Sequence, residues 1–334
     1  MNVLVGDLGG TKTILAVATE EMGPHKLLNE QSFPSARYDS LEMIIREYLN
    51  GSELAVERAC LAVAGPIENG RYAHITNLSW FVNADALCET FALSSVRLIN
   101  DLEAVAYAIP VLEPADIHTL HEGTPVDGGS LAVLAPGTGL GEGFLTLDST
   151  GTYQAHASEG SHVSFGPTNV LQMDLLTYMR EVKGFDHVSY ERVCSGALGL
   201  PNLYDFLKEN GRFPEPPWLV EKLANSEDPT PIIIEAAQDQ INPCVICAAA
   251  LALFCDILAA EAGNLALKVL STGGIYLGGG IPPRILAELE KPGFLEILRN
   301  KGRFREILSK MPVKVILNAK AGLLGAATCG LQSI

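Results

Sequence analysis

Basic residues are scarce in this chain of 334 residues, which holds 23 lysines and arginines against 39 aspartates and glutamates. The formal net charge is therefore −16. Nucleic acids and anionic membranes are bound by clustered lysine and arginine side chains, so neither is expected as a partner. A ligand that carries phosphate groups would have to be held mainly by backbone N–H groups, hydroxyls and a divalent cation.

A cysteine framework and a long apolar run are also missing. Seven cysteines, an odd number, are scattered without regular spacing, which favours a reduced cytoplasmic setting. The longest apolar run, Cys244–Cys255, has 12 residues before Asp256 and is too short to cross a bilayer, so a buried helix is expected. The chain enters its first apolar segment at once, and no signal peptide is expected.

Cys244 and Cys247 have the spacing of a metal-binding pair. Their surroundings are apolar and helical in pattern, no second pair occurs, and the nearest histidine is far away in sequence. Core packing is therefore favoured over metal binding for these two thiols.

The phosphate-loop signature GxxxxGK(S/T) is absent, but another glycine turn follows the apolar run Val3–Val5. It reads Asp7-Leu8-Gly9-Gly10-Thr11-Lys12-Thr13, and an apolar strand resumes after it. The two glycines let backbone N–H groups approach phosphate oxygens, and the two threonines add hydroxyl donors. The aspartate is placed to hold a hydrated Mg²⁺. Taken alone, the segment is explained equally well by a tight structural turn.

A second glycine turn of the same kind lies about one domain length further on. The apolar strand 131–136 runs into Gly137-Thr138-Gly139-Leu140-Gly141, and a second apolar strand leaves that turn. Two such loops can grip a polyphosphate from both sides. Nearer the C-terminus, an apolar core at Ile275–Leu277 is flanked by glycines that leave room for a purine or a ribose: Gly273, Gly274 and Gly279.

Asn100 and Asp101 directly follow the apolar strand Val96–Ile99. A polar pair at a strand end is exposed at the rim of a sheet, where the sites of α/β proteins usually lie. Both residue types also cap helices, and the pair alone would favour that role. Beside two phosphate loops, a functional role is favoured.

Glu159 and His162 lie three residues apart with Gly160 between them, so that a turn could point both side chains into one cavity. A carboxylate accepts hydrogen bonds from two vicinal hydroxyls, and a neutral imidazole donates at one nitrogen and accepts at the other. This is the chemistry that a pyranose demands. The alternative is a surface turn with a solvated glutamate and a hydrogen-bonded histidine.

Together these segments resemble the phosphate-1, phosphate-2 and adenosine segments of the actin/Hsp70/sugar-kinase ATPase superfamily. Within it the chain resembles the bacterial glucokinases that lack a zinc motif, from Asp7 to the stretch 319–327. The most specific segments are 99–101, 135–141 and 158–162. The resemblance implies an α/β fold of the duplicated actin-like ATPase (ribonuclease H-like) type, with two domains around a cleft.

The resemblance also implies the roles of individual residues. Asp101 would be the general base, and ATP and Mg²⁺ would be the cofactors, with Asp7 as the metal ligand through water. The sugar ligands would be Asn100, Asp101, Glu159, His162 and Glu191, although Glu191 could equally form a surface ion pair with Arg192. The ATP-binding residues would be Asp7, Gly9, Gly10, Thr11, Thr13, Gly137, Thr138, Gly139, Gly141, Gly273, Gly274 and Gly279. No structural zinc is expected, because no cysteine-rich knuckle follows His162.

The predicted domains are a small α/β domain of residues 1–110 plus 315–334 and a large α/β domain, 111–314, with helical insertions. Strands are expected at 3–5, 14–18, 27–33, 59–64 and 96–99, and helices at 41–49, 84–91 and 102–108. The region 168–260 is expected to be mostly helical, with loops at Phe213–Pro217 and Ser226–Pro231. In the resembled family the last helix returns to the first domain, and the small residues of 321–327 suit that close packing.

The function predicted is ATP-dependent phosphorylation of the 6-hydroxyl of glucose, by a cytoplasmic enzyme that forms a homodimer. Mannose or glucosamine as substrate, and ADP or polyphosphate as donor, stay open. A sugar-responsive protein without catalysis on the same fold is the rival from another class, although its DNA-binding form does not suit an acidic chain. An actin-like or chaperone ATPase would lack the Glu159, His162 and Glu191 set.

Overall fold

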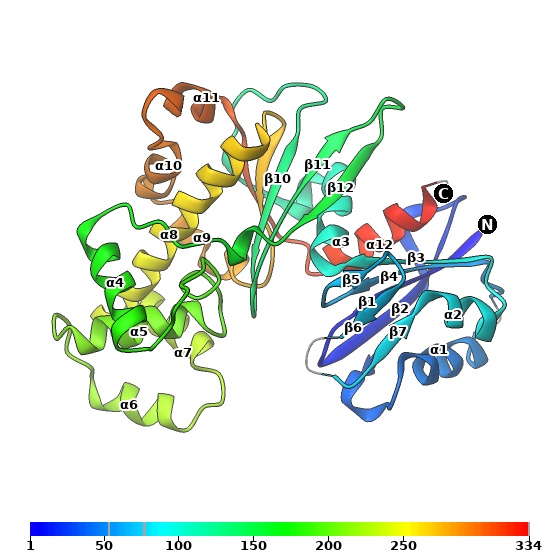
Figure 1. Cartoon of the computed structure of the whole chain (residues 1–334), viewed down its shortest axis with the longest axis horizontal. Coiled ribbons are helices and arrows are strands. Elements are labelled where there is room, and N and C mark those ends of the chain that lie inside the picture. The colour runs from blue at the N-terminus through cyan, green and yellow to red at the C-terminus, as the bar shows by residue number, and fades with distance from the viewer. Residues whose placement is uncertain (53, 76–77, 333–334) are drawn as a thin grey trace. The chain divides into compact units, whose positions relative to one another are not determined.

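The computed structural model describes residues 1–52, 54–75 and 78–332, and these form two compact α/β units (Figure 1). Unit 1 comprises Met1–Pro114, Asp148–Ala157 and Asn318–Ile334. Unit 2 comprises Ala115–Leu147 and Ser158–Leu317. Each unit has its own sheet and its own apolar core, and each is described by itself.

The sheet of unit 1 has the strand order β3-β2-β1-β4-β8. Strands β1, β4 and β8 run parallel, whereas β2 and β3 continue β1 as an antiparallel meander. The bounds are β1 Asn2–Leu8, β2 Lys12–Thr19, β3 Gly23–Pro34, β4 Arg58–Val63 and β8 Ser95–Asn100. The five strands expected from apolar runs in this region are confirmed.

Both faces of this sheet are buried, as alternation along β1 makes clear. Leu4 and Leu8 belong to one apolar cluster, and Val3 and Val5 belong to another on the opposite face. Sheets whose central strands are covered on both sides carry nearly continuous apolar runs, which is what the sequence has here.

The helices of unit 1 are α1 Leu41–Asn50, α2 Ala84–Phe91, α3 Asp101–Ala108 and α12 Ala321–Leu331. The three helices expected in the first third of the chain are confirmed, and the Asn83 side chain caps α2. Helix α12 packs on β1, β4 and α3. Gly325 permits this because a side chain there would overlap the backbone of Ala104.

Short elements complete unit 1. A three-stranded antiparallel sheet follows β4, and most of β12 belongs to this unit. The bounds are β5 Ile67–Glu68, β6 Tyr72–His74, β7 Phe81–Asn83, β12 Tyr153–Ser158 and the 3-10 turns η1 Ser35–Arg37, η2 Ile109–Val111 and η3 Pro114–Asp116, the last at the end of the unit.

Five strands of the main sheet lie in unit 2, in the order β11-β10-β13-β14-β9. Strands β10, β13 and β14 are parallel, and β11 pairs antiparallel with β10. The bounds are β9 Ile117–His121, β10 Leu131–Pro136, β11 Leu140–Leu147, β13 Gly274–Leu277 and β14 Val313–Ile316. The glycine turn predicted between 136 and 141 is thus a hairpin between β10 and β11.

The other elements of unit 2 are mainly helices, as expected for 168–260. They are η4 Gly160–His162, α4 Val170–Glu181, α5 Gly199–Glu209, α6 Pro217–Ala224, α7 Pro229–Gln238, α8 Val245–Val269, η5 Pro282–Ile285, α9 Leu286–Leu289, α10 Pro292–Arg299, η6 Gly302–Phe304 and α11 Arg305–Lys310. Two helices begin inside the segments predicted as loops, at Pro217 and Pro229. Proline is accepted in the first turn of a helix, where its missing N–H would have no partner.

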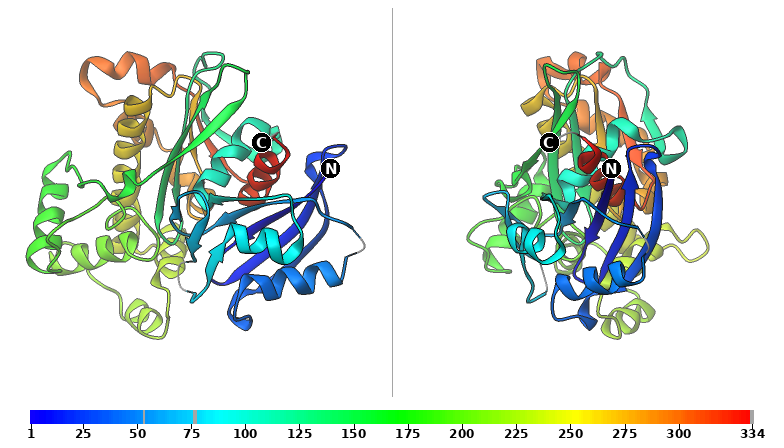
Figure 2. Two further views of the ribbon diagram at one scale, coloured as in Figure 1. Left: turned by 45° about the vertical axis from the view of Figure 1, so that its right-hand side comes forward. Right: turned by 90° about the vertical axis from the view of Figure 1, so that its right-hand side faces the viewer.

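Helix α8 is the long central helix of unit 2, drawn in yellow in Figures 1 and 2. It continues past Asp256 to Val269, so it is longer than the 12-residue apolar run suggested. By length and composition it could cross a membrane, but most of it is buried inside unit 2, where α5, α7 and α10 pack against it. The interpretation as a buried core helix is confirmed.

Candidate active site

The predicted site residues of unit 1 come from one edge of its sheet. Strand register aligns Leu8 with Val63 and Val63 with Asn100, so the carboxyl ends of β1, β4 and β8 lie side by side. Polar residues follow at this edge, and binding sites in parallel α/β sheets form there. The first glycine turn and the Asn100–Asp101 pair therefore meet within unit 1.

The first turn is held by short hydrogen bonds at its base. The Gly9 N–H donates to the Lys12 carbonyl at 3.0 Å, which leaves Gly10 and Thr11 at the tip. The Ser35 hydroxyl donates to the Gly9 carbonyl at 2.7 Å and lies 3.0 Å from the Thr13 hydroxyl.

Thr13 is wholly buried in that arrangement, so its hydroxyl does not face a ligand at the tip. The phosphate-binding role of Thr13 stays a prediction, and its burial favours a supporting role in the turn. Thr13 supports the turn through Ser35, 22 residues further along the chain. Thr11, in contrast, is exposed.

Asp7 is a half-buried carboxylate beside the first turn. Burial and the nearby charge of Asp101 raise the pKa of Asp7 to about 6, and Lys12 opposes this. Gly322, in the first turn of α12, lies close to Asp7. A Cβ at this position would be 3.1 Å from the Asp7 Oδ2, so the absence of a side chain lets the helix approach the carboxylate. Asp7 and Asp101 are thus two carboxylates close enough to repel each other.

Asn100 caps α3, the alternative that the sequence had left open. Its Oδ1 accepts from the Leu102 N–H at 2.9 Å, and Glu103 completes a capping box. Its Nδ2 donates to the Gly65 carbonyl at 3.1 Å. Asp101 is the exposed first residue of the helix, and its Oδ1 also accepts from the Leu102 N–H.

The second glycine turn is held by a neighbouring loop of unit 2. The N–H groups of Gly196 and Ala197 donate to the carbonyls of Gly137 and Thr138, at 2.7 and 3.0 Å. The side chain of Thr138 is exposed at the tip. Gly141 already lies in β11, where it pairs with Ala135.

Three predicted sugar ligands meet beside this second turn. His162 Nε2 lies 3.6 Å from Glu159 Oε2, and its Nδ1 lies 3.7 Å from Glu191 Oε2. The Glu191 carboxylate also lies against Gly139, where a Cβ would come within 2.7 Å of its Oε1. Glu191 thus faces His162. The alternative that the sequence had left open, a surface ion pair with Arg192, is not the arrangement seen here.

The three predicted adenosine glycines do not lie together. Gly279 is at the second turn, because a Cβ there would lie 2.6 Å from the Pro136 carbonyl oxygen. Gly274 pairs with Leu131 at the other end of β10, and Gly273 is pressed against Gly129 and Ser130. Gly273 and Gly274 therefore lie at the end of the strands opposite the turn, and their role in nucleotide binding stays a prediction. They allow close packing where β13 begins.

Cys244 and Cys247 are both buried at the start of α8, as expected for core packing. Within residues 1–52, 54–75 and 78–332, no group of three or more His, Cys, Asp and Glu side chains is arranged to hold a metal ion. Mg²⁺ in phosphate-transfer sites needs only one or two carboxylates, since substrate phosphates and water supply the remaining oxygens. The pair Asp7 and Asp101 fits that requirement.

Sequence reasoning missed several residues that shape these turns, including Ser35 and Gly196. Small side chains carry no chemical signal of their own, and only their neighbours in the fold disclose their role. It also missed Glu142, which directly follows the second turn and is completely buried.

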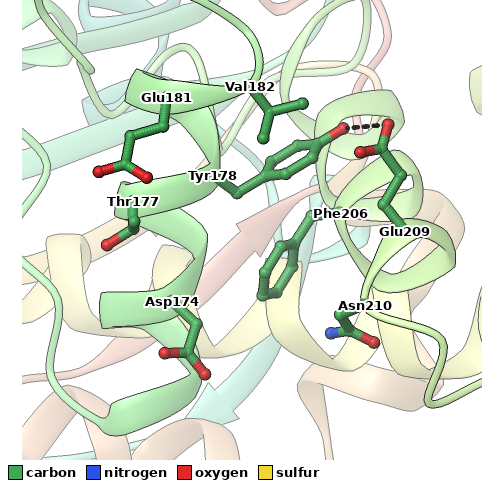
Figure 3. A pocket seen from close by; sticks show the side chains of 8 residues that line it. All are labelled: Asp174, Thr177, Tyr178, Glu181, Val182, Phe206, Glu209 and Asn210. Carbon is green, nitrogen blue, oxygen red and sulfur yellow. Dashed lines mark hydrogen bonds between the residues drawn. The ribbon is translucent and has the colours of Figure 1, made fainter.

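A groove of about 380 Å³ lies elsewhere in unit 2, between α4 and α5 (Figure 3). Tyr178 and Phe206 face each other in it, and Tyr178 donates to Glu209 at 3.1 Å. The lining residues include none of the predicted site residues, so we assign the groove no part in catalysis.

Known proteins and a family model match the chain over nearly its whole length. The family model for glucokinase matches residues 4–333. A glucokinase from Synechocystis sp. is 38% identical, with 100% of this chain and 99% of the relative covered, and one from Nostoc punctiforme is 38% identical, with 99% of each covered.

Among solved structures, a glucokinase from an Antarctic psychrotroph is 33% identical, with a TM-score of 0.82 and 99% of each chain covered. A Streptomyces griseus glucokinase of the ROK family, solved with glucose and AMPPNP, is 21% identical with a TM-score of 0.63 and full coverage of both chains, and it supports the fold alone. The predicted actin-like α/β fold is confirmed. The chain therefore belongs to the glucokinase family, as the sequence motifs predicted.

Proposed function

We propose that the chain transfers a phosphoryl group from ATP to the 6-hydroxyl of glucose, with Asp101 as the general base. The observation that carries this proposal is the edge of the unit 1 sheet. There Asp101, Asp7 and a glycine turn lie together at the ends of parallel strands. Family membership supports the same reaction.

Asp101 would orient the attacking hydroxyl and accept its proton. Phosphoryl transfer has a loose transition state, so the base takes the proton late and its main task is positioning. The first turn of α3 fixes the Asp101 backbone, because the Asn100 cap and the Glu103 carboxylate hold that turn. Asn100 keeps one further amide N–H with which to bind a sugar hydroxyl.

Phosphate oxygens would be held mainly by backbone N–H groups at the turn tips, such as those of Gly10 and Gly139. The N–H groups of Gly9 and Gly137 already donate within the turns, to the carbonyls of Lys12 and Gly139. Thr11 and Thr138 would add hydroxyl donors from exposed positions. Asp7 would hold Mg²⁺ through water. When bound, the ion supplies charge neutralisation for the transferring phosphate. Asp7 would also lose its proton more readily near the ion, since a cation offsets the repulsion from Asp101.

Glu159, His162 and Glu191 would bind sugar hydroxyls. The distances of 3.6 and 3.7 Å between His162 and the two carboxylates exceed hydrogen-bond length. Each group therefore keeps capacity for a ligand hydroxyl. Such a set discriminates by hydroxyl position, because a missing hydroxyl leaves a polar group unpaired.

We also propose a cytoplasmic location and a homodimeric state, on the grounds of family likeness and unpaired cysteines. Analytical ultracentrifugation across a concentration series tests the dimer. A sedimentation coefficient that stays at the monomer value at micromolar concentration would contradict it.

The decisive experiment measures ADP release from MgATP with a panel of glucose, mannose, glucosamine and no sugar. Glucose should give the highest kcat/KM, and ADP release without sugar should be slow. ADP and polyphosphate replace ATP in a second panel. Brisk hydrolysis that is independent of sugar would favour an actin-like or chaperone ATPase, and sugar binding without turnover would favour a regulatory protein.

A further inference from the structure

Glu142 is a buried acid without a visible purpose in the fold. It directly follows the second glycine turn, on β11, and none of its surface is exposed. Among the described residues, neither of its carboxyl oxygens has a hydrogen-bond partner. It shares a strand face with Leu140, and Leu134 is its partner on β10. Both leucines belong to the apolar core of unit 2, where an aliphatic side chain would be the cheaper choice.

The tip of Glu142 lies against the backbone of Gly160. A Cβ at position 160 would overlap the Glu142 Oε2 and lie 3.1 Å from its Cδ. Gly160 begins the turn η4, between Glu159 and His162. The carboxyl group therefore lies directly behind the turn that carries two of the proposed sugar ligands.

The turn also has hydrogen-bonded supports, among them the His162 carbonyl, which lies 2.9 Å from His187 Nε2. The Gly160 N–H donates to the Ser158 hydroxyl at 3.0 Å, and the Ser161 carbonyl accepts from the Glu191 N–H at 3.0 Å. Both ligand side chains are exposed, Glu159 by 79% and His162 by 55%. Contact with the buried Glu142 side chain adds a constraint on the backbone of this turn from the core side.

The charged and titratable groups that face Glu142 come from α8 and from the loop after η4. On α8, buried Glu261 accepts from Asn264 at 2.8 Å and pairs with Lys268 at 3.3 Å. Lys301 donates to Asn264 and lies near Glu261. From the loop, Tyr190 interacts with Glu261, and burial raises the pKa of the Cys194 thiol well above its usual value.

We propose that Glu142 is a positioning residue for sugar binding: its carboxyl group, held in the core against Gly160, fixes the turn that carries Glu159 and His162. This rests on the proposed role of those two residues as sugar ligands. Glu142 itself touches no substrate. It acts by fixing the position and orientation of η4, so removal of the Glu142 side chain should weaken sugar binding more than nucleotide binding.

The proton on Glu142 is part of this arrangement. Burial and the charge of Glu261 raise the pKa of Glu142 to about 8, and Lys268 opposes this only in part. Loss of the proton would place two negative charges side by side in the core. The carboxylate would then move toward water, and the turn above it would have to yield. Sugar affinity should therefore fall at alkaline pH.

The first test compares Glu142→Ala, Glu142→Gln and wild type in steady-state kinetics at pH 7. Glu142→Ala should raise KM for glucose roughly tenfold while changing KM for ATP less than twofold or so. Glu142→Gln keeps the shape without a charge and should restore KM for glucose to near the wild-type value. Glu181→Gln changes an exposed acid of the same unit and serves as the control.

The pH profile separates positioning from general stability. Wild-type KM for glucose should rise above about pH 8, whereas Glu142→Gln should lack that rise. A profile that is identical for the two proteins would overturn the proposal. An equal rise in KM for glucose and KM for ATP in Glu142→Ala would also overturn the proposal.

A double mutant tests the contact itself, and it remains informative if Glu142→Ala alone is poorly folded. Gly160→Ala should raise KM for glucose, because the new Cβ has no room. In Glu142→Ala/Gly160→Ala the methyl group gains space, so KM should fall below that of Gly160→Ala. Additive effects would overturn the proposal.

His162→Ala distinguishes failure of this inference from failure of the proposed sugar site. If His162→Ala leaves KM for glucose unchanged, the assignment of the sugar site is wrong and the inference falls with it. If His162→Ala raises KM for glucose but the Glu142 variants do not, the site stands and the positioning role alone is refuted.

Discussion

The two glycine turns look alike in sequence, yet the acid beside each has a different environment. Asp7 precedes the first turn, is half-buried and lies near Lys12 and Asp101. Glu142 follows the second turn and is sealed in the core with no hydrogen-bond partner among the described residues. Burial raises the pKa of both, to about 6 and about 8.

This difference decides which chemistry each acid can perform. At neutral pH Asp7 is mostly ionised and open to a cation, whereas Glu142 is mostly protonated and can only pack. A glycine turn with a neighbouring acid is therefore not one motif with one function. Which side of the strand the acid occupies determines whether it meets ligand or core.

The largest expected effect is a loss of kcat when Asp101, the proposed general base near the first turn, is replaced. Asp101→Asn keeps the size of the side chain and its place on α3 but cannot accept a proton. We expect kcat to fall on the order of 10²-fold or more with glucose still bound. Steady-state kinetics and glucose binding by calorimetry measure the two quantities.

Asp85→Asn is the matched control for that variant, because Asp85 is an exposed aspartate in the first turn of another helix of unit 1. Near wild-type kcat for Asp101→Asn would remove Asp101 from the mechanism. Equal losses in both variants would point to destabilised helices instead.

The second prediction concerns the effect of buried Glu142 on the free energy of unfolding. Because the pKa of folded Glu142 is about 8 and its ordinary value is 4.5, the folded state binds more protons between these values. The free energy of unfolding should therefore fall as pH rises through that window, by up to about 1.4 kcal/mol per pH unit from this group. Its contribution is complete below pH 4.5 or so and lost above pH 8.

Urea unfolding at pH 6 and pH 7.5 measures this effect, with Glu142→Gln as the comparison. The mutant should lose less stability between the two pH values than the wild type does. If both lose the same amount, Glu142 does not titrate in this range and the contrast between the two acids disappears.

A smaller effect is expected at the sugar turn. His162→Ala should raise KM for glucose roughly tenfold and leave KM for ATP nearly unchanged, because an unpaired buried group costs about 1–3 kcal/mol. His118→Gln, which removes an imidazole paired with Glu290 in the same unit, is the control. Equal changes in both KM values would indicate a structural role.

The smallest effect separates the hydroxyls of the two turns. Thr13→Val should lower stability by about 1 kcal/mol without changing KM for ATP, since the buried Thr13 hydroxyl is hydrogen-bonded to Ser35. Thr138→Val should do the reverse and raise KM for ATP modestly. Thermal unfolding and ATP kinetics on both variants test this. If Thr13→Val raised KM for ATP and Thr138→Val lowered only stability, the roles given to these two hydroxyls would be reversed.

Much of the fold could be predicted because its strands are continuous apolar runs. The strands of unit 1 are buried on both faces, and such runs are visible without knowledge of their partners. Helix α2 could be placed from its cap at Asn83. The starts of α6 and α7 were missed, because a proline inside a polar stretch indicates a loop as readily as a first helical turn.

The candidate site was less predictable where roles depend on distant neighbours. Thr13 is next to a glycine turn in sequence, but its partner is Ser35. Gly273 and Gly274 flank a strand at the end remote from the turn, and only the parallel register of β13 with β10 shows which end that is. Glu142 had no signal, since an acid after a glycine turn normally faces water.

The packing of α12 on α3 has a consequence for synthesis on the ribosome. Gly325 lies against the backbone of Ala104, one turn from the helix start that presents Asp101. Residues 321–331 emerge only after the whole of unit 2 has been translated. A nascent chain can therefore complete its second unit first, but the helix of the proposed base stays without its packing partner until residues 321–331 have been translated. Kinase activity should therefore appear only after α12 has been translated and packed on α3.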